Sequence, residues 1–194
     1  MANRLIAITG GIGSGKSFAL SILKNEGFIT LSSDIITAEL YEKRKIKLIL
    51  KKMFPSAVKG LFNLKIDRKE ISKIVFNNKD KLNELTDTIT PLVLEEIINR
   101  AKKFDGTVFV EVPILFEKGY QSTFDNVIII KRDKTSRVES VKTRSKLTEK
   151  EILDRINNQF DYENSDLSPF ITVINDAGEN ELKEKLLEVI KNIK

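Results

Sequence analysis

The sequence predicts an α/β fold in which a five-stranded parallel sheet is flanked by helices. Short, continuous apolar runs recur along the chain, and they are typical of strands that are buried on both faces. Long segments with apolar residues at helical spacing separate these runs, as in parallel sheets with helical crossovers. Right-handed crossovers would bring the carboxyl ends of the strands to one edge of the sheet, where ligands bind. The expected strands are residues 5–8, 28–31, 108–112, 127–130 and 170–174.

A glycine-rich segment, Gly10–Ser17, follows the first expected strand directly. Its sequence, GGIGSGKS, fits the phosphate-loop pattern of glycine, four residues, glycine, lysine, and serine or threonine. Glycines allow backbone N–H groups to surround a phosphate, because they lack Cβ and tolerate positive φ. The helix expected after the loop, which should end near Gly27, adds free N–H groups and the positive end of its dipole.

Two side chains of this loop have expected roles of their own. The Lys16 ammonium can reach the β- and γ-phosphates of a nucleotide, and the Ser17 hydroxyl can hold Mg²⁺. A flexible glycine-rich turn is the alternative interpretation, but a strand before the loop and a helix after it are the context that a phosphate loop requires. The sequence therefore predicts a P-loop NTPase fold.

Helix starts are marked at several points between the expected strands. Asp67 followed by Glu70 resembles a capping arrangement, and Thr148–Glu151 has capping-box spacing for a helix that runs to Gln159. Thr90–Pro91 predicts another helix start, with proline at the first helical position. The basic stretch 43–52 has apolar residues at helical spacing, which predicts an amphipathic helix with a solvated basic face.

Two of the helical segments are longer than a simple crossover needs. A phosphate-loop protein with two such segments is typical of a small-molecule kinase, in which one segment holds the acceptor and the other closes as a lid. We therefore expect one domain over residues 1–194. Its core is expected at about 1–34, 106–133 and 167–194, its helical acceptor-binding lobe at about 35–105, and its helical lid at about 134–166.

Carboxylates follow two of the expected strands at the same edge as the loop. Asp34 can accept a hydrogen bond from an acceptor hydroxyl and orient it for in-line attack. It can equally cap a helix that starts at Ile35, and spacing alone leaves both interpretations open. Glu111 can help to hold Mg²⁺ through a water, or it can simply bond to neighbouring backbone at the end of its strand.

Arginines gather around the second helical segment, where guanidinium groups would suit phosphate oxygens. Each of them alone also fits a surface ion pair, and only one or two need be functional. They are Arg132, Arg137, Arg144 and Arg155.

The composition excludes several kinds of chemistry. The 194 residues include no cysteine and no histidine, which removes disulfides, thiolate catalysis and imidazole bases. A general base near neutral pH has to be a carboxylate or a strongly perturbed lysine. The net charge of +5 could favour anionic partners, but acidic residues interleave with the lysines and favour a solvated surface. We therefore expect neither a nucleic-acid nor a membrane partner.

The location in the cell is also an expectation from sequence. No stretch approaches the roughly 18 apolar residues of a membrane span. The segment Met1–Arg4 leads directly into the first expected strand, which leaves no room for a secretory signal. Together with the absence of cysteine, this predicts a cytoplasmic enzyme.

Several motifs occur in an order that resembles the dephospho-coenzyme A kinase family over nearly the whole chain. The phosphate loop alone is shared by many families, whereas the ordered set is far more specific. The motifs are Thr9–Ser17, Asp34–Ile36, Asp67–Arg68, Ile74–Asn77, Thr90–Leu92, Val112–Glu117, Arg155–Ile156 with Gln159, and Val173–Ile174 before Gly178.

The resemblance implies MgATP-dependent phosphorylation of the ribose 3′-hydroxyl of dephospho-coenzyme A. It implies that Asp34 is the catalytic aspartate, acting with Lys16. It also implies an ATP site formed by Gly11, Ile12, Gly13, Ser14, Gly15, Lys16, Ser17, the lid residue Arg144 and the backbone around Asn175, with Mg²⁺ at Ser17. The implied acceptor site contains Asp34, Arg68, Pro113, Leu115 and Phe116.

The chain departs from the family's usual residues at four positions. Ser32 stands in place of an aspartate, Phe18 in place of a threonine, Thr90 in place of a histidine and Ser140 in place of an arginine. The catalytic aspartate and the loop are retained, so activity is still expected, in a monomer or weak homo-oligomer.

Three other functions compete with this one. Another P-loop kinase could act on a nucleoside, nucleotide or sugar-like acceptor, although the Val112–Glu117 motif favours dephospho-coenzyme A. A GTP-driven switch needs an Asn-Lys-x-Asp string, whereas Lys79 and Asp80 are adjacent here and lie in a helical region. A nucleic-acid-binding module would bind in a strongly salt-dependent way.

Overall fold

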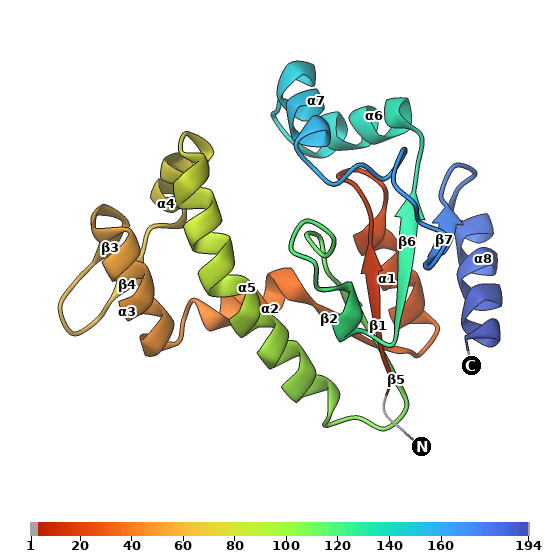
Figure 1. The fold of residues 1–194 in the computed structure, drawn as a ribbon, viewed down its shortest axis with the longest axis horizontal. Coiled ribbons are helices and arrows are strands. Elements are labelled where there is room, and N and C mark those ends of the chain that lie inside the picture. Colours follow the sequence, from red (N-terminus) through yellow and green to blue (C-terminus); the bar gives the residue numbers. More distant parts are fainter. Residues whose placement is uncertain (1–3, 194) are drawn as a thin grey trace. The chain divides into compact units, whose positions relative to one another are not determined.

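The computed structural model describes residues 4–193, so the expectation about Met1–Arg4 falls largely outside the described residues. Five strands form one sheet in the order β2-β5-β1-β6-β7 (Figure 1). Every neighbouring pair of strands is parallel, which confirms the predicted sheet. The strands are β1 (Arg4–Thr9), β2 (Ile29–Ser32), β5 (Thr107–Glu111), β6 (Asn126–Lys131) and β7 (Ile171–Ile174).

Apolar side chains on both faces of the sheet are buried, which explains why these strands read as continuous apolar runs. On one face, Ile8, Phe109 and Ile128 belong to the same core cluster as residues of helices α1 (Lys16–Asn25) and α8 (Glu179–Asn192). Phe28 packs edge-on against Phe109, with ring centroids 5.4 Å apart. Burying each large side chain contributes roughly 1.5–3 kcal/mol, so this layer holds the strand ends in place.

The described residues form two compact units, 4–32 with 101–193, and 33–100. The first contains the sheet, α1, α6 (Lys134–Arg144), α7 (Glu149–Asn157) and α8. The second contains four α-helices, a short 3-10 helix (Pro55–Ala57) and a two-stranded antiparallel sheet that the sequence did not predict. Its elements are α2 (Ser33–Leu40), α3 (Arg44–Met53), β3 (Val58–Lys59), β4 (Lys65–Ile66), α4 (Arg68–Phe76) and α5 (Lys79–Ala101).

Two predicted caps are confirmed. The Asp67 side chain accepts a hydrogen bond from the Glu70 N–H at the start of α4. Thr148 and Glu151 form a reciprocal capping box at the start of α7 (Glu149–Asn157). That helix ends two residues before Gln159, so Gln159 lies in the segment that follows it. Among residues 4–193, no helix combines the length and the apolar composition that crossing a membrane requires.

The predicted helix start at Pro91 is wrong, because α5 is continuous through this residue. A proline inside a helix removes one backbone hydrogen bond and crowds the preceding turn. The helix nevertheless buries Ile89, Val93 and Ile97, which are four residues apart and share one face. The burial of Ile89 and Val93, on either side of Pro91, offsets the free-energy cost of the proline inside the helix. No sequence rule weighs these two effects against each other.

The basic stretch forms the amphipathic helix that was predicted. Ile46 and Leu50 of α3 are buried, whereas Arg44, Lys45 and Lys52 are exposed. The exposed basic side chains of α3 are consistent with a solvated face.

Candidate active site

The glycine-rich segment forms a tight loop between β1 and α1. Gly10, Gly13 and Gly15 adopt φ values of 142°, 78° and 97°, which other residues rarely adopt. A Cβ on Gly13 would also collide with the backbone of Arg137. Within the described residues, no side chain caps α1, so the N–H groups of its first turn are available to an anion.

Lys16, the first residue of α1, bends back over the loop. Its Nζ donates to the carbonyl oxygens of Gly10 at 2.7 Å and Gly11 at 3.0 Å. Burial lowers the pKa of Lys16 to about 8; Glu111 opposes this shift, whereas Arg144 and Arg137 add to it. Lys16 is therefore a partly desolvated cation with neutral hydrogen-bond partners, which a phosphate would replace favourably.

Ser17 and Glu111 bring two side-chain oxygen atoms together at the edge of the sheet. The Ser17 hydroxyl donates to Glu111 Oε1 at 2.8 Å. Glu111 ends β5, where it is 7% exposed and pairs in register with Ile8 and Ser32. A hydroxyl and a carboxylate are hard oxygen ligands of the kind that Mg²⁺ prefers. These residues fit a magnesium ion that completes its coordination with phosphate oxygens, and no acidic cluster within residues 4–193 could hold one alone.

Two side chains that the sequence did not assign to the loop form hydrogen bonds with Ile12, at the apex of the loop. The Ile12 N–H donates to Gln159 Oε1 at 2.7 Å, and Arg137 Nε donates to the Ile12 carbonyl at 2.9 Å. Arg137 belongs to α6 (Lys134–Arg144) and is 5% exposed. Its spacing from the buried Val141 on the same helix face marks it as inward-facing. That spacing does not identify the backbone atom that it bonds.

Asn175 and Arg144, both predicted at the ATP site, have different surroundings. Asn175 is buried, and its Nδ2 donates to the carbonyl of Ser14 at 2.9 Å, so its side chain contacts the loop directly. Arg144 is the last residue of α6 and is exposed. It lies near enough to Lys16 to lower the pKa of that lysine.

The turn after β5 is anchored by aromatic packing. The Phe116 ring stacks on Phe160 with centroids 4.7 Å apart, and it meets Tyr162 and Phe170 edge-on. Leu115 is completely buried in this conformation, whereas Pro113 is half-buried. The turn that was predicted to contact the acceptor is thus tied to the segment after α7.

Tyr162 also reaches the start of the phosphate loop. Its hydroxyl lies 3.3 Å from Thr9 Oγ1, at the end of β1. Burial raises the pKa of Tyr162 to about 12, so this hydroxyl stays protonated near neutral pH. Tyr162 can therefore act as a hydrogen-bond donor here.

Asp34 and Arg68 lie in the second unit. Helix α2 begins at Ser33, so Asp34 lies inside its first turn and is not the cap of a helix that starts at Ile35. Its side chain is exposed. Arg68 Nη2 donates to the carbonyl of Ala38 at 3.0 Å, and its guanidinium lies over the ring of Tyr41. The carboxylate of Asp34 is thus open to solvent in this unit.

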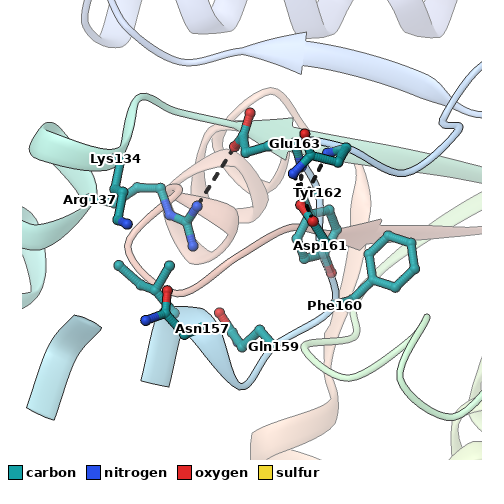
Figure 2. A pocket seen from close by; sticks show the side chains of 10 residues that line it. Lys134, Arg137, Asn157, Gln159, Phe160, Asp161, Tyr162 and Glu163 are labelled. Atoms are coloured by element: carbon teal, nitrogen blue, oxygen red, sulfur yellow. Dashed lines mark hydrogen bonds and ion pairs between the residues drawn. The ribbon is translucent and has the colours of Figure 1, made fainter. Parts of the chain in front are cut away.

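A cavity of about 300 Å³ lies beside the segment that follows α7 (Figure 2). Arg137 and Gln159 line it together with Glu163, which comes within 3.9 Å of the Arg137 Nη1 atom. Lys131 forms a second ion pair with Glu163 at 3.1 Å. The buried guanidinium of Arg137 therefore has a carboxylate nearby, although not in hydrogen-bond contact.

The strand, loop and helix geometry, with a strand-end carboxylate beside the loop serine, defines a P-loop nucleotide-binding protein. A family model described as "Dephospho-CoA kinase" matches residues 4–181. The chain therefore belongs to the dephospho-CoA kinase family.

Individual relatives agree with this assignment. A dephospho-CoA kinase from Thermus thermophilus is 32% identical over 152 residues, which cover 78% of this chain and 72% of the relative. The crystal structure of TT1252 from Thermus thermophilus has a TM-score of 0.86 at 29% identity, covering 99% of this chain and 98% of that one. A structure of the dephospho-CoA kinase from Campylobacter jejuni has a TM-score of 0.68 at 26% identity, covering 97% and 96%.

Proposed function

We propose that this protein transfers the γ-phosphoryl group of ATP to the ribose 3′-hydroxyl of dephospho-coenzyme A, giving coenzyme A and ADP. The observation that carries this proposal is a complete phosphate loop, with Lys16 above it and Glu111 beside it, in a chain of the dephospho-CoA kinase family. Phosphoryl transfer depends mainly on positioning and on stabilising charge, and these residues supply both.

The phosphates of ATP would lie in the loop. Backbone N–H groups of the loop and of the first turn of α1 would donate to the phosphate oxygens, and Lys16 would exchange its two carbonyl partners for them. Ser17 would bind Mg²⁺ directly and Glu111 through a water. The ion would neutralise developing charge on the β- and γ-phosphate oxygens.

Asp34 would orient the acceptor hydroxyl. Chain connectivity supports this role, because Asp34 follows Ser32 by two residues and Ser32 is in register with Glu111 at the end of the sheet. The chain has no histidine, so a carboxylate is the natural partner for the hydroxyl proton. Because the proton leaves late in a loose transition state, positioning matters more than basicity.

The remaining parts have proposed roles in substrate binding. Residues 35–105 would form the acceptor lobe, with Arg68 contacting the acceptor. Pro113, Leu115 and Phe116 would form or support a surface that also contacts the acceptor. Residues 134–166 would form the lid, with Arg144 at the ATP phosphates. The cytoplasmic location, the lack of nucleic-acid and membrane partners, and the monomeric or weakly oligomeric state stay predictions.

A panel of acceptors tests this proposal. ADP release with MgATP would be measured in a coupled assay with dephospho-coenzyme A, adenosine or AMP as acceptor. We expect rapid turnover with dephospho-coenzyme A alone. Preferred turnover of adenosine or AMP would instead identify another P-loop kinase, and no ADP release with any acceptor would contradict the kinase function.

A further inference from the structure

We propose that Gln159 and Arg137 are positioning residues that aim the phosphate loop by holding both polar atoms of Ile12. We call this pair of side chains the apex clamp. The inference rests on the proposed function, because the loop is taken to bind ATP. It adds a role for two residues that need not touch either substrate.

The apex clamp joins parts of the chain that are far apart in sequence. Gln159 is 147 positions from Ile12 and accepts its N–H, whereas Arg137 is 125 positions away and donates to its carbonyl. Both side chains come from the segment proposed as the lid. The loop apex is therefore bonded to the lid and not only to its own backbone.

The two bonds fix the two peptide groups that flank Ile12. In a trans peptide, the C=O and the N–H point in opposite directions. Arg137 holds the Ile12 carbonyl on the side of α6, so the N–H of Gly13 in the same peptide must point to the other side. Gln159 holds the Ile12 N–H, so the Gly11 carbonyl points away from it. There this carbonyl accepts Lys16 Nζ at 3.0 Å and the Ser14 N–H at 3.2 Å.

The packing around Arg137 fits a specific role. Its guanidinium lies against Gly11, where a Cβ would collide with it, and a Cβ on Gly13 would collide with the Arg137 backbone. Burial lowers the pKa of Arg137, with Glu163 partly opposing this shift. A buried guanidinium stays charged and is costly to desolvate, so its bond to the Ile12 carbonyl is a strong, charge-assisted one.

A loop aimed in this way is ready before the nucleotide arrives. Glycine-rich peptides rotate easily, and binding ATP to a loose loop would include the cost of ordering it. The apex clamp removes much of this cost in the nucleotide-free protein. Its loss should weaken the binding of ATP and leave the binding of the acceptor unchanged.

Gln159→Leu removes the acceptor at nearly constant size, and Gln159→Glu keeps an acceptor oxygen. Arg137→Met removes the donor. We expect the KM for ATP to rise about tenfold in Gln159→Leu and in Arg137→Met, the effect of one lost hydrogen bond to a buried group. The KM for dephospho-coenzyme A should stay within about twofold of the wild-type value. In Gln159→Glu, which keeps an acceptor oxygen, the KM for ATP should lie close to the wild-type value. Lys134→Ala, on the same cavity wall, is the matched control and should change neither KM.

Amide hydrogen exchange tests the apex clamp without turnover. The Ile12 amide of the nucleotide-free wild-type protein should be protected, and Gln159→Leu should expose it while Gln159→Glu keeps it protected. A rapidly exchanging Ile12 amide in the wild-type protein would overturn the proposal even if no variant folds. Equal increases in both KM values, or an unchanged KM for ATP in Gln159→Leu, would also overturn it.

Calorimetric titration with a non-hydrolysable ATP analogue separates this inference from the proposed function. If the analogue binds and the variants weaken it, the apex clamp stands even when dephospho-coenzyme A proves to be the wrong acceptor. If the wild-type protein does not bind the analogue, the proposed function fails. A protected Ile12 amide would then report only a structural contact, and the positioning role would fail with the function.

Discussion

The Ser17 hydroxyl donates a hydrogen bond of 2.8 Å to Glu111, a residue 94 positions further along the chain. The two residues meet because α1 starts beside the end of β5, at the edge where the carboxyl ends of parallel strands gather. This hydrogen bond gives each of the two side chains a polar partner. With MgATP bound, both oxygens would turn to the metal and its water.

Ser17→Ala and Glu111→Gln should therefore raise the Mg²⁺ concentration needed for half-maximal ADP formation. We expect a shift of roughly tenfold or more, because each variant removes or neutralises an oxygen ligand of the ion or of its water. A magnesium titration at saturating ATP measures the shift. Ser21→Ala is the control, since the Ser21 hydroxyl bonds the backbone of its own helix, at Phe18. Equal magnesium requirements in all three variants would rule out the metal site.

The lowered pKa of Lys16 predicts a pH dependence of ATP binding. Burial brings this pKa to about 8, so the side chain is mainly charged below this pH and loses its proton above it. Because phosphate binds the charged form, the Kd for MgATP should be constant from about pH 7 to 7.5 and rise up to about tenfold per pH unit above 8.

Two variants separate Lys16 from other titrating groups. Lys16→Arg keeps its charge at all these pH values, so its Kd should change little between pH 7 and 9.5, whatever its absolute affinity. Lys24→Ala removes an exposed lysine from the same helix and should keep the wild-type profile. A wild-type Kd that does not change up to pH 9.5 would contradict the predicted titration.

Asp34→Ala should lower kcat by roughly 10²- to 10⁴-fold, the usual contribution of a positioned proton acceptor. Binding of MgATP should persist, because Asp34 is proposed to touch only the acceptor hydroxyl. Asp80→Ala, at an exposed acidic residue in the first turn of α5, should keep wild-type kcat. Undiminished turnover in Asp34→Ala would remove its proposed role.

Phe109→Ala should destabilise the fold by about 3–5 kcal/mol, because it leaves a cavity in the core. Phe109 is fully buried on β5 and packs edge-on against Phe28. Urea unfolding followed by circular dichroism measures the change. Phe62→Ala, at a side chain that is 86% exposed, should change the free energy of unfolding by less than about 0.5 kcal/mol. Similar losses in the two variants would contradict this account of the core.

Local pattern was enough to predict the main sheet and the loop. Leu5–Ile8 and the other expected strands are continuous apolar runs, and their expected ends lie within one residue of the observed ends. The meeting of Ser17 with Glu111 follows from their places at one edge of a parallel sheet. By contrast, β3 and β4 have two residues each, which is too short for any periodicity to appear.

Other features depend on contacts that no local pattern encodes. Pro91 reads as a helix start, yet burial of Ile89 and Val93 on both sides keeps α5 continuous. Gln159 and Arg137 bond to backbone atoms of Ile12. Every residue type except proline has these backbone atoms, so the residue type at position 12 does not reveal the two bonds. Such side-chain-to-backbone contacts emerge only when α6 and the segment after α7 are packed beside the loop.

The identity of the phosphorylated hydroxyl tests the central claim most directly. A reaction mixture of the protein, MgATP and dephospho-coenzyme A would be followed by phosphorus NMR until the ATP is consumed. The account predicts one new phosphomonoester on the ribose 3′-oxygen, formed in equal amount to ADP. ADP without this ester, or phosphate on any other hydroxyl, would contradict it.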